Sequence, residues 1–158
     1  MPSLADWKLV AVKMIEIRWF DPNDYEIIQG QEILTAPYAN YPDLLARGGP
    51  ALTAVLDGQP VACGGLVRVW PGTAEGWMKV SPSATAVSTM FFRKVYRALR
   101  FWARELNLHR IQTYVDPTNN TFIRWAELLG FRVEAYMSQW GPNGEPMALY
   151  AWLPKVLK

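Results

Sequence analysis

The segment 119–131, which reads NNTFIRWAELLGF, restricts the fold of this chain more than any other. Its apolar residues recur at helical spacing, so that one side of a helix carries Phe122, Trp125 and Leu129. Asn119 is a favoured N-cap residue, and Gly130 is the usual residue where a helix ends in a left-handed turn. The β-rich runs 110–115 and 131–140 flank this helix. The segment therefore predicts the strand-helix-strand unit that closes a compact α/β domain.

Upstream of this unit, the spacing of apolar residues indicates further strands and helices. Strands are predicted at 9–18, 51–56, 61–70 and 74–80, two short helices between 21 and 47, a long helix at 84–106, and a last strand at 147–153. Asp57-Gly58 is typical of a tight hairpin turn. The predicted order is β-α-α-β-β-β-α-β-α-β-β. A length of 158 residues without a linker or repeat fits a single domain, 1–158.

Positive charge is concentrated on one side of the long predicted helix. Its apolar stripe is opposed by Arg93, Arg97, Arg100 and Arg104. Such a face meets a nucleotide phosphate, an acidic partner or a nucleic acid in some proteins, and is solvated in most. The formal net charge of +2 is too small for non-specific binding to nucleic acid, which needs many clustered cations. We interpret the arginine face as solvated.

The scarcity of cysteine and histidine excludes several kinds of site. Cys63 is the only cysteine and His109 the only histidine, so no internal disulfide and no site with two histidines can be built. No metal site is predicted. No apolar run reaches the ~18 residues of a membrane span. These features are typical of a soluble protein of the reducing cytoplasm, with Cys63 buried and inert.

The predicted order of elements and the segment 119–131 resemble the GNAT superfamily of acyl-CoA-dependent N-acyltransferases. Members commonly carry Asn, an apolar or small residue three positions on, and then Leu-Tyr-Glu-Lys-Leu-Gly-Phe; here Asn119, Leu129, Gly130 and Phe131 match. The resemblance implies an α/β (α+β) GNAT-like fold with four helices and a central mixed, mostly antiparallel sheet of about seven strands. It also implies an enzyme that transfers an acyl group from acetyl-CoA, or another acyl-CoA, to a small amine or protein amine by direct attack.

The resemblance further implies where acyl-CoA is held. In the family, backbone amides of a splayed strand take the pantetheine, and the N-terminus of the next helix holds the pyrophosphate. The matching segments here are 79–83 and 84–90. The residues expected at this site are Lys79, Val80, Ser81, Ser88, Thr89 and Asn119. The family's Arg or Gln, Gly, and Gly or Ala are replaced by Thr85, Ser88 and Met90. A helix that no longer needs to admit a phosphate would also begin in this way.

Acyl transfer to an amine needs a base for the ammonium and an acid for the leaving thiolate. Glu75, near the start of strand 74–80, is the candidate base, and a solvated charge at a strand end is the alternative. Many relatives carry the acid as a tyrosine where this chain has Ala126. Tyr136 is the candidate replacement, with Tyr114 as another; either is otherwise an aromatic residue packed beside the sheet. The departures at Thr85, Ser88, Met90 and Ala126 argue for reduced or lost activity.

A second resemblance implies a different function. The segment 60–65, Trp77, the basic long helix and the turn at 141–144 are similar to GNAT-like proteins encoded by phages, among them the small internal core protein of short-tailed phages. This resemblance implies a non-catalytic virion component, with protein partners in the phage particle, that kept the fold and lost CoA binding. The two hypotheses differ at the splayed strand, because the enzyme requires an open groove between strands 74–80 and 110–115.

Overall fold

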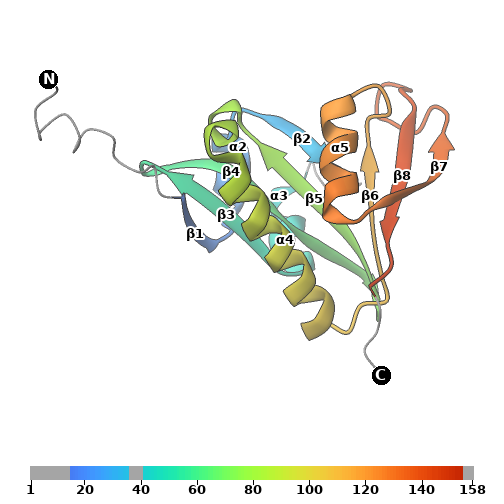
Figure 1. The fold of residues 1–158 in the computed structure, drawn as a ribbon, viewed down its shortest axis with the longest axis horizontal. Coiled ribbons are helices and arrows are strands. Elements are labelled where there is room, and N and C mark those ends of the chain that lie inside the picture. The colour runs from blue at the N-terminus through green and yellow to red at the C-terminus, as the bar shows by residue number, and fades with distance from the viewer. Residues whose placement is uncertain (1–14, 36–40, 155–158) are drawn as a thin grey trace, which may run out of the picture.

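The computed structural model describes residues 15–35 and 41–154, which form one twisted sheet with helices on both of its faces (Figure 1). In chain order the elements are β1 (Ile15–Trp19), α2 (Pro22–Ile27), β2 (Gln31–Leu34), α3 (Pro42–Gly48), β3 (Ala51–Leu56), β4 (Gln59–Trp70), β5 (Thr73–Val80), the 3-10 helix η1 (Pro82–Val87), α4 (Ser88–Glu105), β6 (Arg110–Val115), α5 (Asn120–Leu129), β7 (Arg132–Met137) and β8 (Met147–Trp152).

The sheet has eight strands in the order β1-β3-β4-β5-β6-β8-β7, with β2 paired to β5 outside this path. All paired strands are antiparallel except β5 and β6. These two pair through Thr73, Ala74 and Glu75 of β5 with Arg110, Ile111 and Gln112 of β6. Beyond these residues they separate, and we call the gap between them the fork. The mixed, mostly antiparallel sheet predicted from the sequence is confirmed, with one strand more than expected.

Apolar residues form a separate core on each face of the sheet. On the face covered by α4 and α5, the cluster includes Ala74, Met78 and Val80 of β5. On the face that carries α2 and α3, Trp77 of β5 packs in a cluster with Tyr25 and Leu45. Because side chains alternate along a strand, Glu75 and Lys79 lie on the α2/α3 face together with Trp77. This division decides which functional groups can meet.

The closing unit has the structure that its sequence predicts. The Asn119 side-chain oxygen accepts a hydrogen bond from the Phe122 backbone N–H at 3.1 Å and so caps α5. Gly130 has a φ of 110°, in the left-handed region that a β-carbon disfavours. Leu129 and Phe131, on either side of it, are fully buried. Burial of each of these side chains contributes about 1.5–3 kcal/mol, so the unit is held by its core as well as by its caps.

The larger differences from the sequence prediction lie before the long helix and at its start. The predicted strand 9–18 is observed as β1 from Ile15, and residues 9–14 lie outside the described part. The two predicted short helices are α2 and α3, but β2 between them was not expected. Its four residues, QEIL, are too few to show a period, and its partner β5 is distant in sequence. The long predicted helix begins as η1 before it continues as α4.

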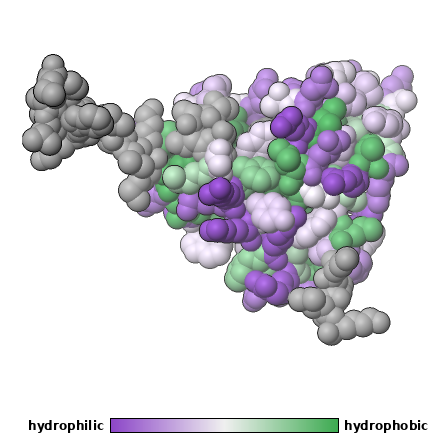
Figure 2. Space-filling model, viewed as in Figure 1, coloured by the Kyte–Doolittle hydropathy of each residue, from purple (hydrophilic) through white to green (hydrophobic). Residues whose placement is uncertain are grey.

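Arg100 corrects the interpretation of the arginine face on α4 as solvated throughout. Its guanidinium carbon lies 3.3 Å from the ring centroid of Tyr96 and 4.5 Å from that of Trp152, a cation-π arrangement. Its Nη2 donates to the Leu129 carbonyl oxygen at 2.9 Å, at the end of α5. Arg100 therefore joins α4 to α5 and β8. On the side of the molecule that Figure 2 shows, hydrophilic and hydrophobic residues are interspersed.

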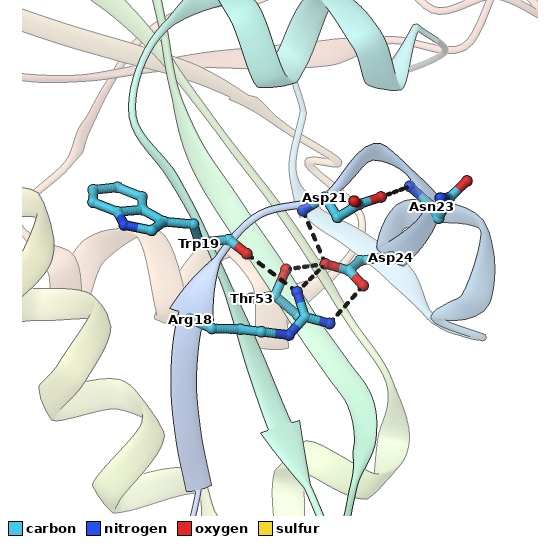
Figure 3. A network of polar contacts seen from close by, with 6 residues as sticks. All are labelled: Arg18, Trp19, Asp21, Asn23, Asp24 and Thr53. Atoms are coloured by element: carbon cyan, nitrogen blue, oxygen red, sulfur yellow. Dashed lines mark hydrogen bonds and ion pairs between the residues drawn. The ribbon is translucent and has the colours of Figure 1, made fainter.

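A partly buried ionic network fixes α2 against the sheet (Figure 3). Asp24 is only 3% exposed and accepts two hydrogen bonds from the Arg18 guanidinium, at 2.7 and 2.8 Å. It also accepts from the Thr53 hydroxyl at 2.7 Å and from the Asp21 backbone N–H at 3.0 Å. Burial by itself raises the pKa of the Asp24 carboxyl, but these hydrogen bonds bring that pKa below its usual value.

Asp24→Asn is expected to lower the free energy of unfolding by about 2–4 kcal/mol at neutral pH, because it removes charge-assisted bonds and leaves the Thr53 hydroxyl poorly paired. A carboxyl whose pKa is depressed in the folded state stabilises fully above its unfolded pKa, and this stabilisation is lost as pH falls through the folded pKa. The difference between native and variant, measured by urea denaturation, should therefore shrink below about pH 4. Asp43→Asn, an exposed acidic residue in the first turn of α3, is the control. An equal loss in both variants would contradict the argument.

Candidate active site at the fork

Glu75 lies at the base of the fork, on the α2/α3 face of the sheet. It is 7% exposed, although the sequence left open a solvated position at a strand end. Its Oε1 accepts a hydrogen bond from Gln112 Nε2 at 3.1 Å and one from the Tyr114 hydroxyl at 3.3 Å. Its Oε2 is buried and has no hydrogen-bond partner among the described residues. Burial raises the pKa of this carboxyl, and the bonds from Gln112 and Tyr114 offset part of the rise.

Aromatic rings form one side of the surroundings of Glu75. The Tyr114 ring stacks on the Trp140 ring, with a centroid distance of 4.1 Å and an interplanar angle of 23°. Trp140 comes from the loop between β7 and β8, so the stack joins this loop to β6. The arrangement combines an acceptor-rich carboxylate with aromatic faces, and both attract an ammonium group.

Tyr136, the predicted acid, does not lie near Glu75. Its register partner on β8 is Ala148, which belongs to the core on the α4/α5 face, and the Tyr136 side chain is 71% exposed. Glu75 lies on the opposite face. The structure therefore brings Tyr114, rather than Tyr136, to the candidate base.

A groove of about 550 Å³ lies on the α4/α5 face, next to the end of β5. Its lining comes from β2 and the two residues before it, the end of β5, η1, α4 and the start of α5: Gln29, Gly30, Gln31, Val80, Ser81, Pro82, Ala84, Phe91, Asn119, Thr121, Phe122 and Trp125. Three residues predicted to hold acyl-CoA are among them, namely Val80, Ser81 and Asn119. The Ser81 hydroxyl is buried and has no hydrogen-bond partner among the described residues. The groove therefore offers side-chain amides and aromatic rings to a neutral, amide-containing ligand, and the Ser81 hydroxyl is buried beside it.

Two of the other predicted acyl-CoA residues, Lys79 and Thr89, lie elsewhere. The Lys79 ammonium is on the α2/α3 face, where it donates to the Tyr25 carbonyl oxygen at 2.6 Å and lies 4.2 Å from the centroid of the Tyr25 ring. Thr89 is exposed in the first turn of α4 and does not line the groove. Ser88 is the first residue of α4, and its side chain lies outside the described part. No charged side chain is among the described residues that line the groove.

β2 occupies the fork itself. It pairs with β5 through Gln31 with Val80, Glu32 with Lys79 and Leu34 with Met78. On its other side, Thr35 exchanges two backbone hydrogen bonds with Tyr114 of β6, at 2.9 and 3.0 Å. β2 therefore closes the gap that β5 and β6 leave open.

Side-chain contacts hold β2 in the fork. Leu34 is 5% exposed in the α4/α5 core, and the Tyr25 hydroxyl donates to the Glu32 carboxylate on the other face. Gly30 lies so close to β5 that an added β-carbon would stand 2.1 Å from the Val80 carbonyl oxygen. The groove on one face and Glu75 on the other are thus separated by a strand of the chain itself.

Sequence reasoning named Tyr114 as an alternative acid but missed β2 and the contact of Gln112 with Glu75. Arg110, Gln112 and Tyr114 occupy alternate positions of β6, and such a run of polar groups on an inner strand is the signal that was available. The described residues contain no group of three or more His, Cys, Asp or Glu side chains placed to hold a metal ion. None of the helices in the described ranges combines the length and apolar character that crossing a bilayer requires.

Comparisons with known proteins bear on the fold. No protein-family model matches this sequence, and no curated protein matches it. Among solved structures, Ard1 from Thermoplasma volcanium is similar with a TM-score of 0.71 at 17% identity, over 91% of this chain and 99% of its own. An acetyltransferase of the GNAT family from Bacillus anthracis gives 0.65 at 19% identity, over 88% of this chain and 94% of its own.

YncA from Salmonella typhimurium, whose structure includes its cofactor acetyl-CoA, gives a TM-score of 0.64 at 20% identity, over 88% of this chain and 93% of its own. At such identities the likeness shows the fold alone. This chain has the GNAT fold, as its sequence predicted. The resemblance to phage proteins stays a prediction.

Proposed function

We propose that this chain, which has the GNAT fold, is an N-acyltransferase that moves an acyl group from acyl-CoA, acetyl-CoA in the simplest case, to an amine. The acceptor is a small amine or a protein amine, and the enzyme works in the cytoplasm. The observation that carries the proposal is Glu75: its carboxylate is buried at the fork, both donors that reach it bind Oε1, and Oε2 is left to accept a proton.

The acceptor amine arrives mostly as an ammonium ion, which cannot attack a thioester until it loses a proton. We assign this proton to Oε2 of Glu75. The raised pKa of this carboxyl brings it closer to that of the ammonium and makes it a better base than an exposed glutamate. The neutral amine then attacks the thioester carbonyl directly. The thiolate that leaves needs a proton in turn, and we assign the acid role to Tyr114 in place of Tyr136.

Acyl-CoA would lie in the groove beside Val80, Ser81 and Asn119. The side-chain amides that line the groove fit the uncharged, amide-rich pantetheine arm, and a small shift of Ser81 would expose its buried, unpartnered hydroxyl to the same arm. The described lining of the groove supplies no charged side chain for the pyrophosphate, so the phosphates would depend on backbone N–H groups near the start of the long helix.

Calorimetric titration with acetyl-CoA, followed by an assay of CoA release with polyamines, amino acids and lysine peptides, tests the proposal. Saturable binding and amine-dependent release of CoA are the expected results. Absence of both heat and release at millimolar acetyl-CoA would reject the enzyme. The ring of Trp125 lines the groove, so binding there should change its fluorescence. The variant Trp125→Phe should lack this part of the fluorescence change.

One observation favours a second candidate, a non-catalytic protein with the same fold. β2 fills the fork and uses the edge of β5 that would otherwise be free to bind a ligand. This candidate includes the phage virion component, whose partners would be other proteins of the particle. Stable association with purified particles, together with no binding of acetyl-CoA, is the outcome that would favour it over the enzyme.

A further inference from the structure

A continuous chain of polar side chains links residues of β7, β6 and β5 and reaches Glu75. On β7, Glu134 accepts two hydrogen bonds from the guanidinium of Arg110, from Nη1 at 3.0 Å and from Nη2 at 2.6 Å. The same guanidinium donates from Nε to Gln112 Oε1 at 2.8 Å, two residues further along β6. Gln112 Nε2 then donates to Glu75 Oε1 on β5. From Arg110 through Gln112 to Glu75 the donors point in one direction, while the same guanidinium also donates the other way, to Glu134.

The direction follows from the donor and acceptor inventory of the groups. A guanidinium only donates, so it can meet the side-chain amide of Gln112 only through the amide oxygen. The amide nitrogen must then face Glu75, where it finds an acceptor. A flipped amide would place its N–H groups against Arg110 and its oxygen against the Glu75 carboxylate, so that both contacts would become repulsive. Arg110 thus selects one of the two amide orientations.

We propose that Arg110 is a positioning residue for Glu75, acting through Gln112 to keep Oε1 hydrogen-bonded and so leave Oε2 as the proton-accepting oxygen. This inference rests on the function proposed above, in which Glu75 is the base. Gln112 and Tyr114 both donate to Oε1, which makes that oxygen less basic than Oε2. Without the Arg110 contact the Gln112 amide can rotate, and Glu75 loses a donor that favours its ionised form.

Other ionisable groups share this face of the sheet without a hydrogen bond to the Glu75 carboxylate. They come from α2, β2, β4, β5 and β7, and are Tyr25, Glu32, Cys63, Lys79 and Glu134. Tyr25 contacts Glu32 and Lys79, and Glu134 binds Arg110. Burial raises the pKa of the Cys63 thiol to about 12, so it stays neutral. The hydrogen-bond donors that influence the protonation of Glu75 are therefore Gln112 and Tyr114.

A double-mutant cycle tests the proposal. Arg110→Met and Gln112→Met are each expected to move the titration of the Glu75 carboxyl carbon, followed by NMR, to higher pH by about one unit, the effect of one lost hydrogen bond to a charge. The acidic limb of the pH profile of kcat/KM should move in parallel. The double variant should move no further, because Arg110 acts through Gln112. Additive shifts, or no shift in Arg110→Met, would overturn the proposal.

Glu134→Gln is the matched control. It breaks the ion pair of Arg110 but leaves the contact between Arg110 Nε and Gln112, so the Glu75 titration is expected to stay in place. If Arg110 acted only through its positive charge, removal of the neighbouring negative charge would move the titration to lower pH, which would count against the proposal. The NMR titration needs no acyl donor. If the protein shows no turnover, the proposed function is rejected. The NMR titration still shows whether Arg110 positions Glu75.

Discussion

Glu75→Gln is expected to slow acyl transfer by about 10²–10⁴-fold, the usual contribution of a positioned general base, and to raise the free energy of unfolding at neutral pH. The loss of activity follows because an amide cannot accept the proton that Oε2 accepts. The gain in stability follows because the native protein buries an ionised carboxylate with one unpaired oxygen, and a neutral amide of the same shape costs less to bury.

The pH dependence of this stability has a definite sign. The pKa of Glu75 is raised on folding, so between its unfolded and folded values the folded state holds more protons than the unfolded state. Stability of the native protein therefore falls as pH rises through this window, which begins near pH 4.3, and the variant lacks that loss. The melting temperatures of the native protein and the Glu75→Gln variant should differ at pH 7 and converge below about pH 4.

Glu16→Gln provides the control for both measurements, because Glu16 is an exposed carboxylate on β1, at the far edge of the sheet. It should leave rate and melting temperature unchanged. If the Glu75→Gln variant melts at a lower temperature than the native protein at pH 7, the carboxylate stabilises the fold and the stability prediction is wrong. If the variant transfers the acyl group at the native rate, Glu75 is not the base of the reaction.

Features encoded by neighbouring residues were predictable from the sequence. The cap at Asn119 and the left-handed Gly130 define α5, and Asp57 and Gly58, with φ of 51° and 78°, form the turn between β3 and β4. In each case the backbone requirement and the residue that meets it lie within a few positions. The GNAT fold could therefore be inferred, because its order of elements depends mainly on such local signals.

The placement of Tyr136 could not be predicted, because it depends on an irregularity in strand pairing. The register between β7 and β8 shifts by one residue between Val133 and Ala135. Without this bulge Tyr136 would face Met147 and lie on the same side as Glu75. With the bulge it faces Ala148 and moves to the other side, since a slip of one residue exchanges the two faces of a strand. Nothing in the segment 132–137 marks the bulge.

The position of β2 was equally hidden, because its pairing depends on contacts distant in sequence. Gln31, Glu32 and Leu34 belong to a segment between two helices, where a loop is the simpler expectation. Only the fork supplies β2 with partners on both sides, and a fork is a property of the assembled sheet. For the same reason the sequence could give the residues at the edge of β5 but could not show that the chain itself covers them.

Locking β2 in the fork is expected to abolish acyl transfer. The groove lies on the α4/α5 face and Glu75 on the α2/α3 face, and the fork between β5 and β6 is the place where the sheet could connect them. While β2 fills it, a thioester bound in the groove cannot meet an amine held at Glu75. Turnover therefore requires β2 to leave, at least in part. If only a fraction of the molecules is open, the apparent activity is that fraction of the activity of the open form.

A disulfide between Glu32→Cys and Lys79→Cys, in a Cys63→Ala background, would provide the lock. Residues 32 and 79 are register partners, a geometry within the reach of a disulfide, and Cys63 is removed because it faces Lys79 from β4. The oxidised protein is expected to transfer at least about a hundredfold more slowly than the same protein after reduction. A second disulfide, Glu16→Cys with Val55→Cys between β1 and β3, serves as the control and should leave oxidised and reduced rates equal.

Hydrogen exchange measures the same opening without an acyl donor. Amides of β2 and the facing edge of β5 should exchange faster than those of the β3–β4 pair, because a four-residue strand can open locally without unfolding the core. Oxidation of the 32–79 disulfide should slow this exchange. If the locked and reduced forms transfer at the same rate, the fork is not the route between donor and base. If β2 exchanges only with global unfolding and no transfer is observed, β2 is a permanent part of the sheet, and the non-catalytic candidate is then favoured over the enzyme.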